Sequence, residues 1–170
     1  GFDDLPSLKD RVREQIKADF ARAGRTHLKR QILDALDKAH DFPLPPAMVE
    51  SEFVNIWAQV EVELKREGKT AADEAGSEEA LRAEYRAIAE RRVRLGLVLG
   101  RLGEQNGIIV SPEEVQRAIA MQARQFPGQE QQVVQYYAGN QQAQIEIRAP
   151  ILEDKVVDFI VGRADVTERS

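Results

Sequence analysis

The chain has 170 residues with 24 Lys+Arg and 29 Asp+Glu, which gives a formal net charge of −5. That acidity offers no support for a nucleic-acid-binding protein, and the lack of cysteine excludes disulfides, thiolate metal sites and cysteine nucleophiles. No apolar run approaches the ~18 residues that a membrane span needs. Strong helix formers dominate, so we predict an all-α protein. Because the chain opens on Gly1 and not on methionine, we expect it to be part of a longer protein.

A long first helix is predicted over residues 6–40, with Ser7 or Asp4 as its cap. Its apolar stripe recurs about every four residues and comprises Leu8, Val12, Ile16, Phe20, Leu28, Ile32, Leu36 and Ala39. The segment carries nine Lys+Arg and five Asp+Glu, so it is cationic within an acidic chain. A stripe this narrow predicts a strut that connects other parts of the protein, not the centre of a core.

A helical hairpin is predicted over residues 46–105. The proline-rich segment 42–46 must end the first helix, since residues before proline favour extended backbone. Helices are expected over 46–67 and 78–105, with a polar tip at 68–76 between them. The apolar face of the first of these two helices comprises Val49, Phe53, Ile56, Trp57, Val60 and Leu64. Residues 93–102 are apolar almost all round, which predicts burial, and Gly96 and Gly100 are expected to let a neighbour approach closely.

The remaining segment, 111–139, is predicted to hold two shorter helices. Ser111, Pro112 and Glu114 form a helix-start signature, and Pro127 ends the helix that follows. The second short helix carries Val133, Val134, Tyr136 and Tyr137.

A last helix is predicted over 141–163, which Pro150 should kink or split. Residues 164–170 are expected to form an extended tail.

No constellation of catalytic or metal-binding residues emerges. The only two histidines, His27 and His40, lie on the cationic helix and beside the proline-rich break, where structural or solvated roles are expected. Gly68-Lys69-Thr70 resembles the end of a phosphate-binding loop, but Glu63 stands where the required earlier glycine would be. The cluster at residues 91–94, Arg-Arg-Val-Arg, is interpreted as a solvated edge. We predict no catalytic residue, no cofactor, no metal and no nucleic-acid partner.

Hydrophobic surface remains as the candidate site. Six large, adaptable side chains could lie either in the core or in an open apolar cradle: Met48, Phe53, Trp57, Phe126, Tyr136 and Tyr137. Any one of them is more often a core residue than a contact residue, and periodicity alone does not separate the two roles. Leu95 and Leu99 are expected to be buried and provide control positions for a test of contact with another polypeptide.

Several runs, in order along nearly the whole chain, carry a family resemblance. They are residues 28–36 (Leu-Lys-Arg-Gln-Ile-Leu-Asp-Ala-Leu), 42–45 (Phe-Pro-Leu-Pro), 48–50 (Met-Val-Glu), 91–100 (Arg-Arg-Val-Arg-Leu-Gly-Leu-Val-Leu-Gly), 134–137 with Asn140, 151–157 and 164–168. Through these runs the chain resembles the C-terminal chaperone domain of bacterial trigger factor.

The resemblance implies an elongated multi-helical body of the trigger factor C-terminal and SurA peptide-binding kind. The helix at 6–40 would be a linker, 46–105 the first arm and 111–139 the second arm, with 141–163 returning to the body. The implied function is that of an ATP-independent, cytoplasmic chaperone that holds hydrophobic segments of unfolded or nascent polypeptides. With that function, the six side chains of the candidate site are expected to contact the bound polypeptide. In the family, ribosome docking and peptidyl-prolyl isomerase activity belong to two other domains, so this chain is expected not to be an enzyme.

The same apolar surface would also allow a homodimer, because a second copy can cover it. Three other interpretations stay open: an inert structural or oligomerisation domain, an all-α ligand-binding regulator, and a periplasmic chaperone with a related helical body. A regulator with a DNA-binding helix-turn-helix would begin with short helices, whereas this N-terminus predicts one long helix. A periplasmic chaperone would usually carry a parvulin-like domain, and nothing in this sequence matches one.

Overall fold

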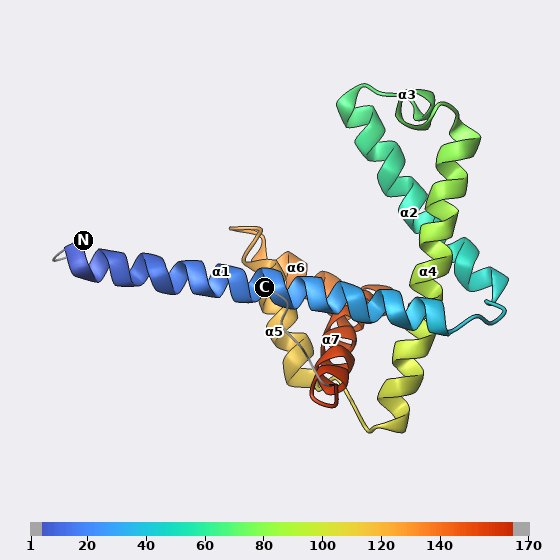
Figure 1. Cartoon of the computed structure of the whole chain (residues 1–170). Helices are drawn as coiled ribbons and strands as arrows, with labels where there is room; N and C mark the ends of the chain where they lie inside the picture. The colour runs from blue at the N-terminus through green and yellow to red at the C-terminus, as the bar shows by residue number, and fades with distance from the viewer. Residues whose placement is uncertain (1–4, 165–170) are drawn as a thin grey trace. The chain divides into compact units, whose positions relative to one another are not determined.

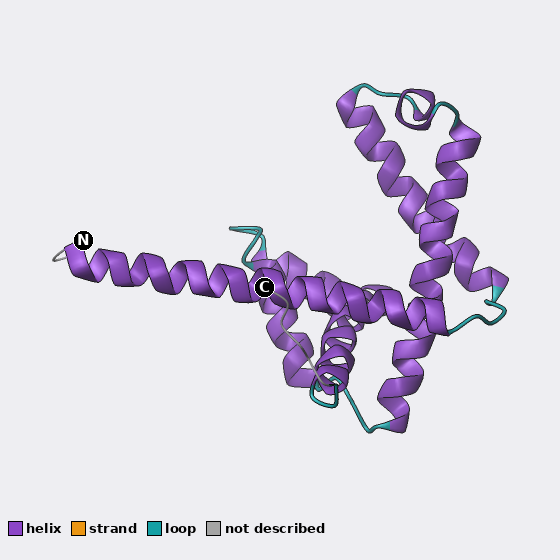
Figure 2. Ribbon diagram, in the orientation of Figure 1, coloured by secondary structure: helices purple, strands orange, loops and turns teal. Residues whose placement is uncertain are grey.

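The protein is all-α, as the composition predicts. A computed structural model describes residues 5–164, and within that range it contains helices and loops but no strand (Figures 1 and 2). The helices are α1 (Leu5–Ala39), α2 (Pro46–Glu67), α3 (Ala71–Ala75), α4 (Glu78–Gln105), α5 (Pro112–Ala123), α6 (Glu130–Gly139) and α7 (Gln141–Val161). Asp4 and nearly all of the expected tail at 164–170 lie outside the described residues.

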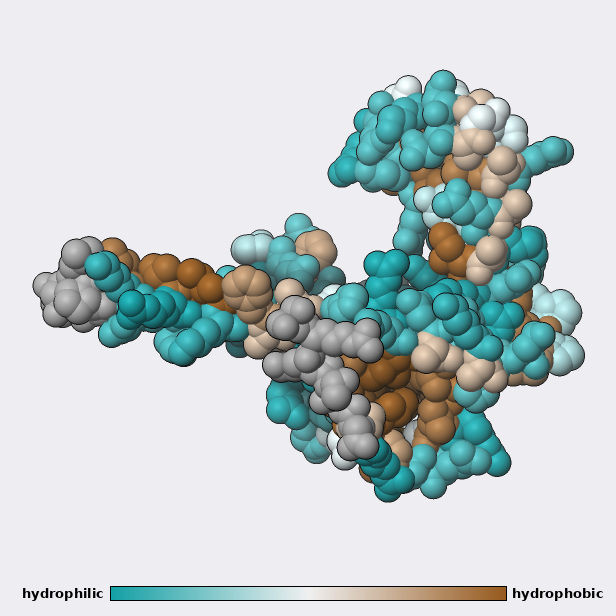
Figure 3. Space-filling view, viewed as in Figure 1, coloured by the Kyte–Doolittle hydropathy of each residue, from teal (hydrophilic) through white to brown (hydrophobic). Residues whose placement is uncertain are grey.

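The first compact unit consists of α1 and ends at Ala39. The helix continues through Gly24 without a break, and Ser7 lies inside it, so Ser7 is not its cap. Ion pairs spaced three residues apart support it on its exposed surface, such as Arg13 with Asp10 at 2.9 Å. The N-terminal half of its apolar stripe stands open to solvent and is visible as a brown row in Figure 3; the exposed fractions run from 37% at Leu8 to 75% at Phe20. Further along the stripe, Leu28, Ile32 and Leu36 are half-buried.

The second compact unit begins at His40 and holds the other six helices among the described residues. Pro46 opens α2, and Gly68 ends it in the left-handed conformation (φ 67°) that glycine adopts without strain. The tip expected as a polar loop contains the short helix α3. Thr70 starts α3 through a capping box, in which Asp73 donates its backbone N–H to the threonine hydroxyl and accepts the Thr70 N–H in return.

Helices α2 and α4 form the expected hairpin, with α3 at its far end (Figure 1). Its core is a cluster of five buried residues: Phe53, Ile56, Trp57, Leu81 and Ala89. Two ion pairs link the helices along their exposed edge: Arg86 donates to Glu50 at 2.7 Å, and Arg92 to Glu52 at 3.0 Å. Apolar packing and these two ion pairs together hold α2 against α4.

The C-terminal half of α4 packs against α7, and the close approach occurs at Gly103. A Cβ atom at Gly103 would lie 3.2 Å from Leu152 Cδ1 and 3.4 Å from the carbonyl oxygen of Ile108. The expectation for Gly96 and Gly100 was wrong, because a Cβ atom at either position would meet nothing within 4 Å. The glycine at which α4 and α7 pack closely is Gly103, about one helical turn after Gly100.

Helices α5 and α6 pack against each other and against α7. Asn140 caps α7 by accepting the backbone N–H of Ala143 at 3.0 Å. Pro150 does not split the helix, which runs unbroken from Gln141 to Val161. Proline removes one backbone hydrogen bond, and the buried residues Val156 and Val157 anchor the following turns against the body.

Candidate functional site

Two of the six candidate contact residues lie in the hairpin core. Phe53 and Trp57 are only 4% and 7% exposed, and their rings stack at a centroid distance of 6.0 Å. Tyr85 of α4 meets the Trp57 ring edge-on at 6.4 Å, and the Arg82 guanidinium lies 4.3 Å from the Trp57 ring centroid. The indole N–H of Trp57 is also satisfied, since it donates to Glu61 at 2.7 Å.

Another polypeptide therefore does not reach Phe53 or Trp57 while the hairpin is intact. The helical spacing of these two residues is the same for a binding surface and for a helix face that packs against a neighbouring helix. In the structure they belong to the packed face. Their large apolar area stabilises the hairpin, and we withdraw both residues from the set of candidate contacts.

The other four candidates are accessible. Met48, in the first turn of α2, is 46% exposed, Phe126 46% and Tyr136 56%, and Tyr137 is half-buried. Tyr136 and Tyr137 meet edge-to-face at 5.4 Å. Phe126 lies beyond the end of α5, in the turn before α6, and not on the α5 face where periodicity placed it.

Further exposed apolar side chains were missed by the sequence analysis. Met121 on α5 is 67% exposed and Val134 on α6 is 46% exposed; on α2, Val54 and Val62 are 55% and 68% exposed. A signal for Met121 was present, because it lies off the helix face shared by Val115 and Ile119. We use "second-arm residues" for the four exposed apolar side chains of α5, α6 and the turn between them: Met121, Phe126, Val134 and Tyr136.

Figure 3 also shows a hollowed hydrophobic area between the C-terminal half of α4 and α7. These two helices carry half-buried apolar residues: Leu97, Leu102, Ile151, Leu152, Phe159 and Ile160. A separate cleft of ≈ 690 Å³ lies between the proline-rich segment and α4, with Phe42, Leu44 and Val49 beside Arg86 and Arg94. The second unit therefore has concave apolar surface as well as exposed side chains.

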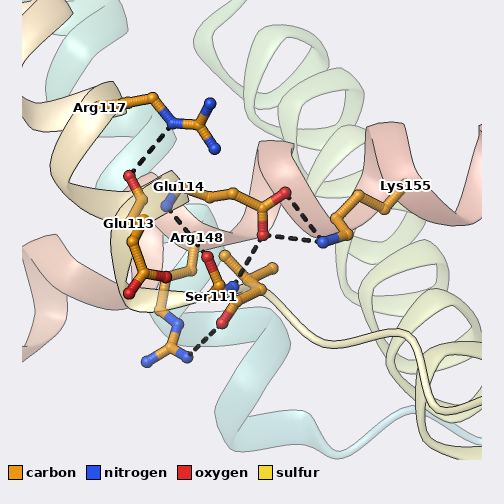
Figure 4. Close-up of polar contacts among 7 residues, drawn as sticks. Ser111, Glu113, Glu114, Arg117, Arg148 and Lys155 are labelled. Carbon is orange, nitrogen blue, oxygen red and sulfur yellow. Dashed lines mark hydrogen bonds and ion pairs between the residues drawn. The ribbon is translucent and has the colours of Figure 1, made fainter.

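A set of polar contacts links the start of α5 to α7 (Figure 4), and we call it the polar joint. Glu114 accepts the backbone N–H of Ser111 at 2.8 Å, which closes the predicted capping box, and both its oxygens lie 2.8 Å from Lys155 Nζ on α7. Arg148, also on α7, donates to the carbonyl oxygen of Val110 at 3.2 Å. The hydrogen bond from Lys155, followed by that from Ser111, holds the pKa of Glu114 below its ordinary value. The joint ties the start of α5 to α7 and so positions the arm.

Among the described residues, no group of three His, Asp or Glu side chains could hold a metal ion. In the same part of the chain, no helix is both long and apolar enough to cross a membrane. His27 pairs with Gln31 on its own helix at 2.9 Å.

A sequence model of one family, described as bacterial trigger factor protein (TF) C-terminus, matches residues 4–162. The chain is 53% identical over 169 residues to the trigger factor of Azorhizobium caulinodans, which covers 99% of this chain and 38% of that protein. It is 54% identical over 169 residues to the trigger factor of Parvibaculum lavamentivorans, covering 99% of this chain and 33% of the relative. The chain thus spans little more than a third of the length of these relatives.

A solved structure of trigger factor domains from Thermotoga maritima has a similar fold. The TM-score is 0.64, and the match covers 97% of this chain and 98% of that one. At 20% sequence identity, this likeness shows the fold alone.

Proposed function

This chain belongs to the family of bacterial trigger factor C-termini, and from that membership we propose that it is a chaperone module that holds hydrophobic segments of unfolded or nascent polypeptides without ATP. The proposal covers these 170 residues. Ribosome docking, peptidyl-prolyl isomerase activity and a cytoplasmic location are proposed for the longer proteins of the family, with the first two assigned to segments outside this one. On that basis the present chain is not an enzyme.

The observation that carries the proposal is the exposure of the second-arm residues. Met121, Phe126, Val134 and Tyr136 are each 46% to 67% exposed, whereas the first hairpin encloses its aromatic residues. Leaving large apolar side chains in water costs free energy that a neighbouring helix could recover. Surface kept open in this way is typical of a binding site.

Contact with apolar segments supplies the binding energy directly. Each Å² of apolar surface that binding removes from water contributes roughly 25 cal/mol to the binding free energy. Contacts between a few side chains of this chain and a few of the bound segment therefore give weak, reversible binding. A flexible methionine and two aromatic rings adapt to many partner shapes, which suits a site that must accept unrelated clients. The half-buried apolar residues between α4 and α7 would extend the surface for longer client segments.

Photocrosslinking tests the proposed contacts in the 170-residue chain. A photoreactive amino acid placed at Met48, Phe126, Tyr136 or Tyr137 should label a denatured client, and the same probe at the buried Leu95 or Leu99 should not. The unmodified chain should also suppress aggregation of that client at molar excess. Equal labelling from Leu95 and Tyr136 would contradict the proposed contacts, and full aggregation would favour an inert domain.

The apolar stripe on α1 favours a second role in self-association. Val12, Ile16 and Phe20 are 48%, 49% and 75% exposed, and a second copy could cover them. In sedimentation velocity, a homodimer formed in this way should dissociate at higher protein concentration in the Phe20→Ser variant than in the parent chain. A dimer that is unaffected by Phe20→Ser would place the interface elsewhere.

A further inference from the structure

Beyond Glu113, Glu114 and Arg117 at the start of α5, the second arm is almost free of charge. Residues 118–145 run from α5 through α6 into α7, and in these 28 positions the only charged residues are Arg124 and Glu130. A window of equal length on the first arm, 61–88, contains 13 charged residues. The contrast is large for a chain in which 31% of all residues are charged. Solubility of residues 118–145 must therefore rest mainly on uncharged polar groups.

Those groups are mainly glutamine amides. Residues 118–145 contain nine glutamines, of which Gln144 donates to the Tyr137 carbonyl oxygen and Gln142 to Glu146. Six others are exposed and make no side-chain hydrogen bond to any described residue: Gln125, Gln129, Gln131, Gln132, Gln135 and Gln141. Each amide offers both a donor and an acceptor. The arm thus presents a set of hydrogen-bonding groups that the fold itself does not use.

A shallow groove places two of these amides beside an apolar side chain. It has a volume of ≈ 340 Å³ and is lined by Glu130, Gln131, Val134 and Gln135, all from α6. Val134 is 46% exposed there. A ligand in the groove would meet the apolar carbon of Val134 and the amides of Gln131 and Gln135, with the Glu130 carboxylate at the same site.

An unfolded polypeptide presents the matching chemistry. Every residue of an extended chain except proline has a free backbone N–H and C=O, and its apolar side chains are uncovered. We infer that the second arm binds extended, uncharged polypeptide segments, with glutamine side chains hydrogen-bonding the client main chain beside the apolar contacts of Val134 and Tyr136. Main-chain recognition is independent of client sequence. This inference rests on the proposed chaperone function and adds the class of segment that this arm takes.

Binding of this kind responds little to salt, because ionic strength screens interactions between charges and not contacts between neutral groups. The affinity of the 170-residue chain for an extended, uncharged, labelled peptide should change less than about twofold between about 0.05 M and about 0.5 M salt. Fluorescence anisotropy measures this affinity directly.

Charge introduced into the groove gives the sharper test. The Gln131→Glu/Gln135→Glu variant should weaken binding of an acidic peptide about tenfold at low salt, with recovery at high salt, since like charges repel. The Gln131→Lys/Gln135→Lys variant should do the same for a basic peptide of equal length. Gln59→Glu, at an exposed position on α2, is the matched control and should leave both affinities unchanged. Circular dichroism checks that each variant keeps its helices.

The inference is overturned if the parent chain loses more than about tenfold of its affinity for the uncharged peptide at high salt, or if both groove variants bind like Gln59→Glu. In either case, continued suppression of client aggregation would leave the chaperone proposal standing. If the parent chain neither binds the peptide nor suppresses aggregation, both proposals are wrong.

Discussion

At the scale of single residues, Trp57 shows how a neighbour decides what an aromatic side chain does. Its ring is covered by Phe53, Tyr85 and Arg82, and its indole N–H is bonded to Glu61. The same residue on an unpartnered helix face would be a binding surface. Met48, nine positions earlier on α2, is 46% exposed and so remains accessible for binding.

Truncation of Trp57 should destabilise the fold. Trp57→Ala should lower the free energy of unfolding by about 3 kcal/mol or more, because it leaves a cavity in the hairpin core. Met48→Ala should change it by about 0.5 kcal/mol or less, since that side chain is half in water already. Urea denaturation followed by circular dichroism measures both. Equal shifts for the two variants would mean that the hairpin core is not where the structure places it.

Gly103 and Gly100 provide a second residue-scale comparison. Alanine at either position gains about 1 kcal/mol of helix propensity, but only at Gly103 must a neighbour, the Leu152 side chain, give way, and the Ile108 carbonyl oxygen leaves no spare room beside it. Gly100→Ala should raise the free energy of unfolding by up to about 1 kcal/mol, and Gly103→Ala should be the less stable variant by about 1 kcal/mol or more. If thermal or urea denaturation shows both variants to be equally stabilised, α4 and α7 do not approach closely at Gly103.

At the scale of elements, the joint between α5 and α7 decides where the second arm points. Glu114 serves the α5 capping box and the ion pair with Lys155 at once. The helix-start signature was readable from the sequence, because a capping box is local. Lys155 lies 41 residues further along the chain, so its pairing with Glu114 depends on the fold.

This joint makes stability depend on pH in a defined direction. Because the pKa of Glu114 is lowered from its ordinary value of 4.5, its ionised form favours the folded state above that pH, and the contribution is lost as pH falls through the folded-state pKa. In Glu114→Gln, stability should therefore fall less steeply between pH 5 and pH 3 than in the parent chain, as urea titrations at each pH would show.

Lys155→Met completes a double-mutant cycle with Glu114→Gln. Since both variants break the same pair, the double variant should lose less stability than the sum of the two single losses. Strict additivity would show that the two side chains do not interact in solution.

At the scale of the whole molecule, exposed aromatic side chains are distributed unevenly over the second unit. The α2–α4 hairpin encloses its aromatic residues and surrounds them with charge, whereas the second arm exposes Phe126 and Tyr136 among neutral amides. If the second arm is the main client surface, removal of its exposed apolar side chains should cost function without costing stability.

The Phe126→Ser/Tyr136→Ser variant tests that expectation. It should unfold at nearly the same urea concentration as the parent chain but require several-fold more protein to halve client aggregation, because it removes two exposed apolar contacts. Val54→Ser/Val62→Ser, at exposed positions of α2, is the control and should retain suppression. A larger loss in the control than in the test variant would move the client surface to the first arm.

The sequence by itself determined the fold class, the family and most helix ends, because capping residues, prolines and apolar periodicity act within one or two turns of the chain. Ser111 and Asn140 start helices by accepting a backbone N–H three residues further on, and Pro46 starts α2 through its fixed backbone angle. Only the tertiary structure decided which apolar side chains are covered: Trp57 lies inside while Tyr136 lies outside, and Gly103, not Gly96 or Gly100, permits the close approach. The physical reason is that burial depends on which helix packs opposite a residue, and the period of a single helix holds no information about its partner.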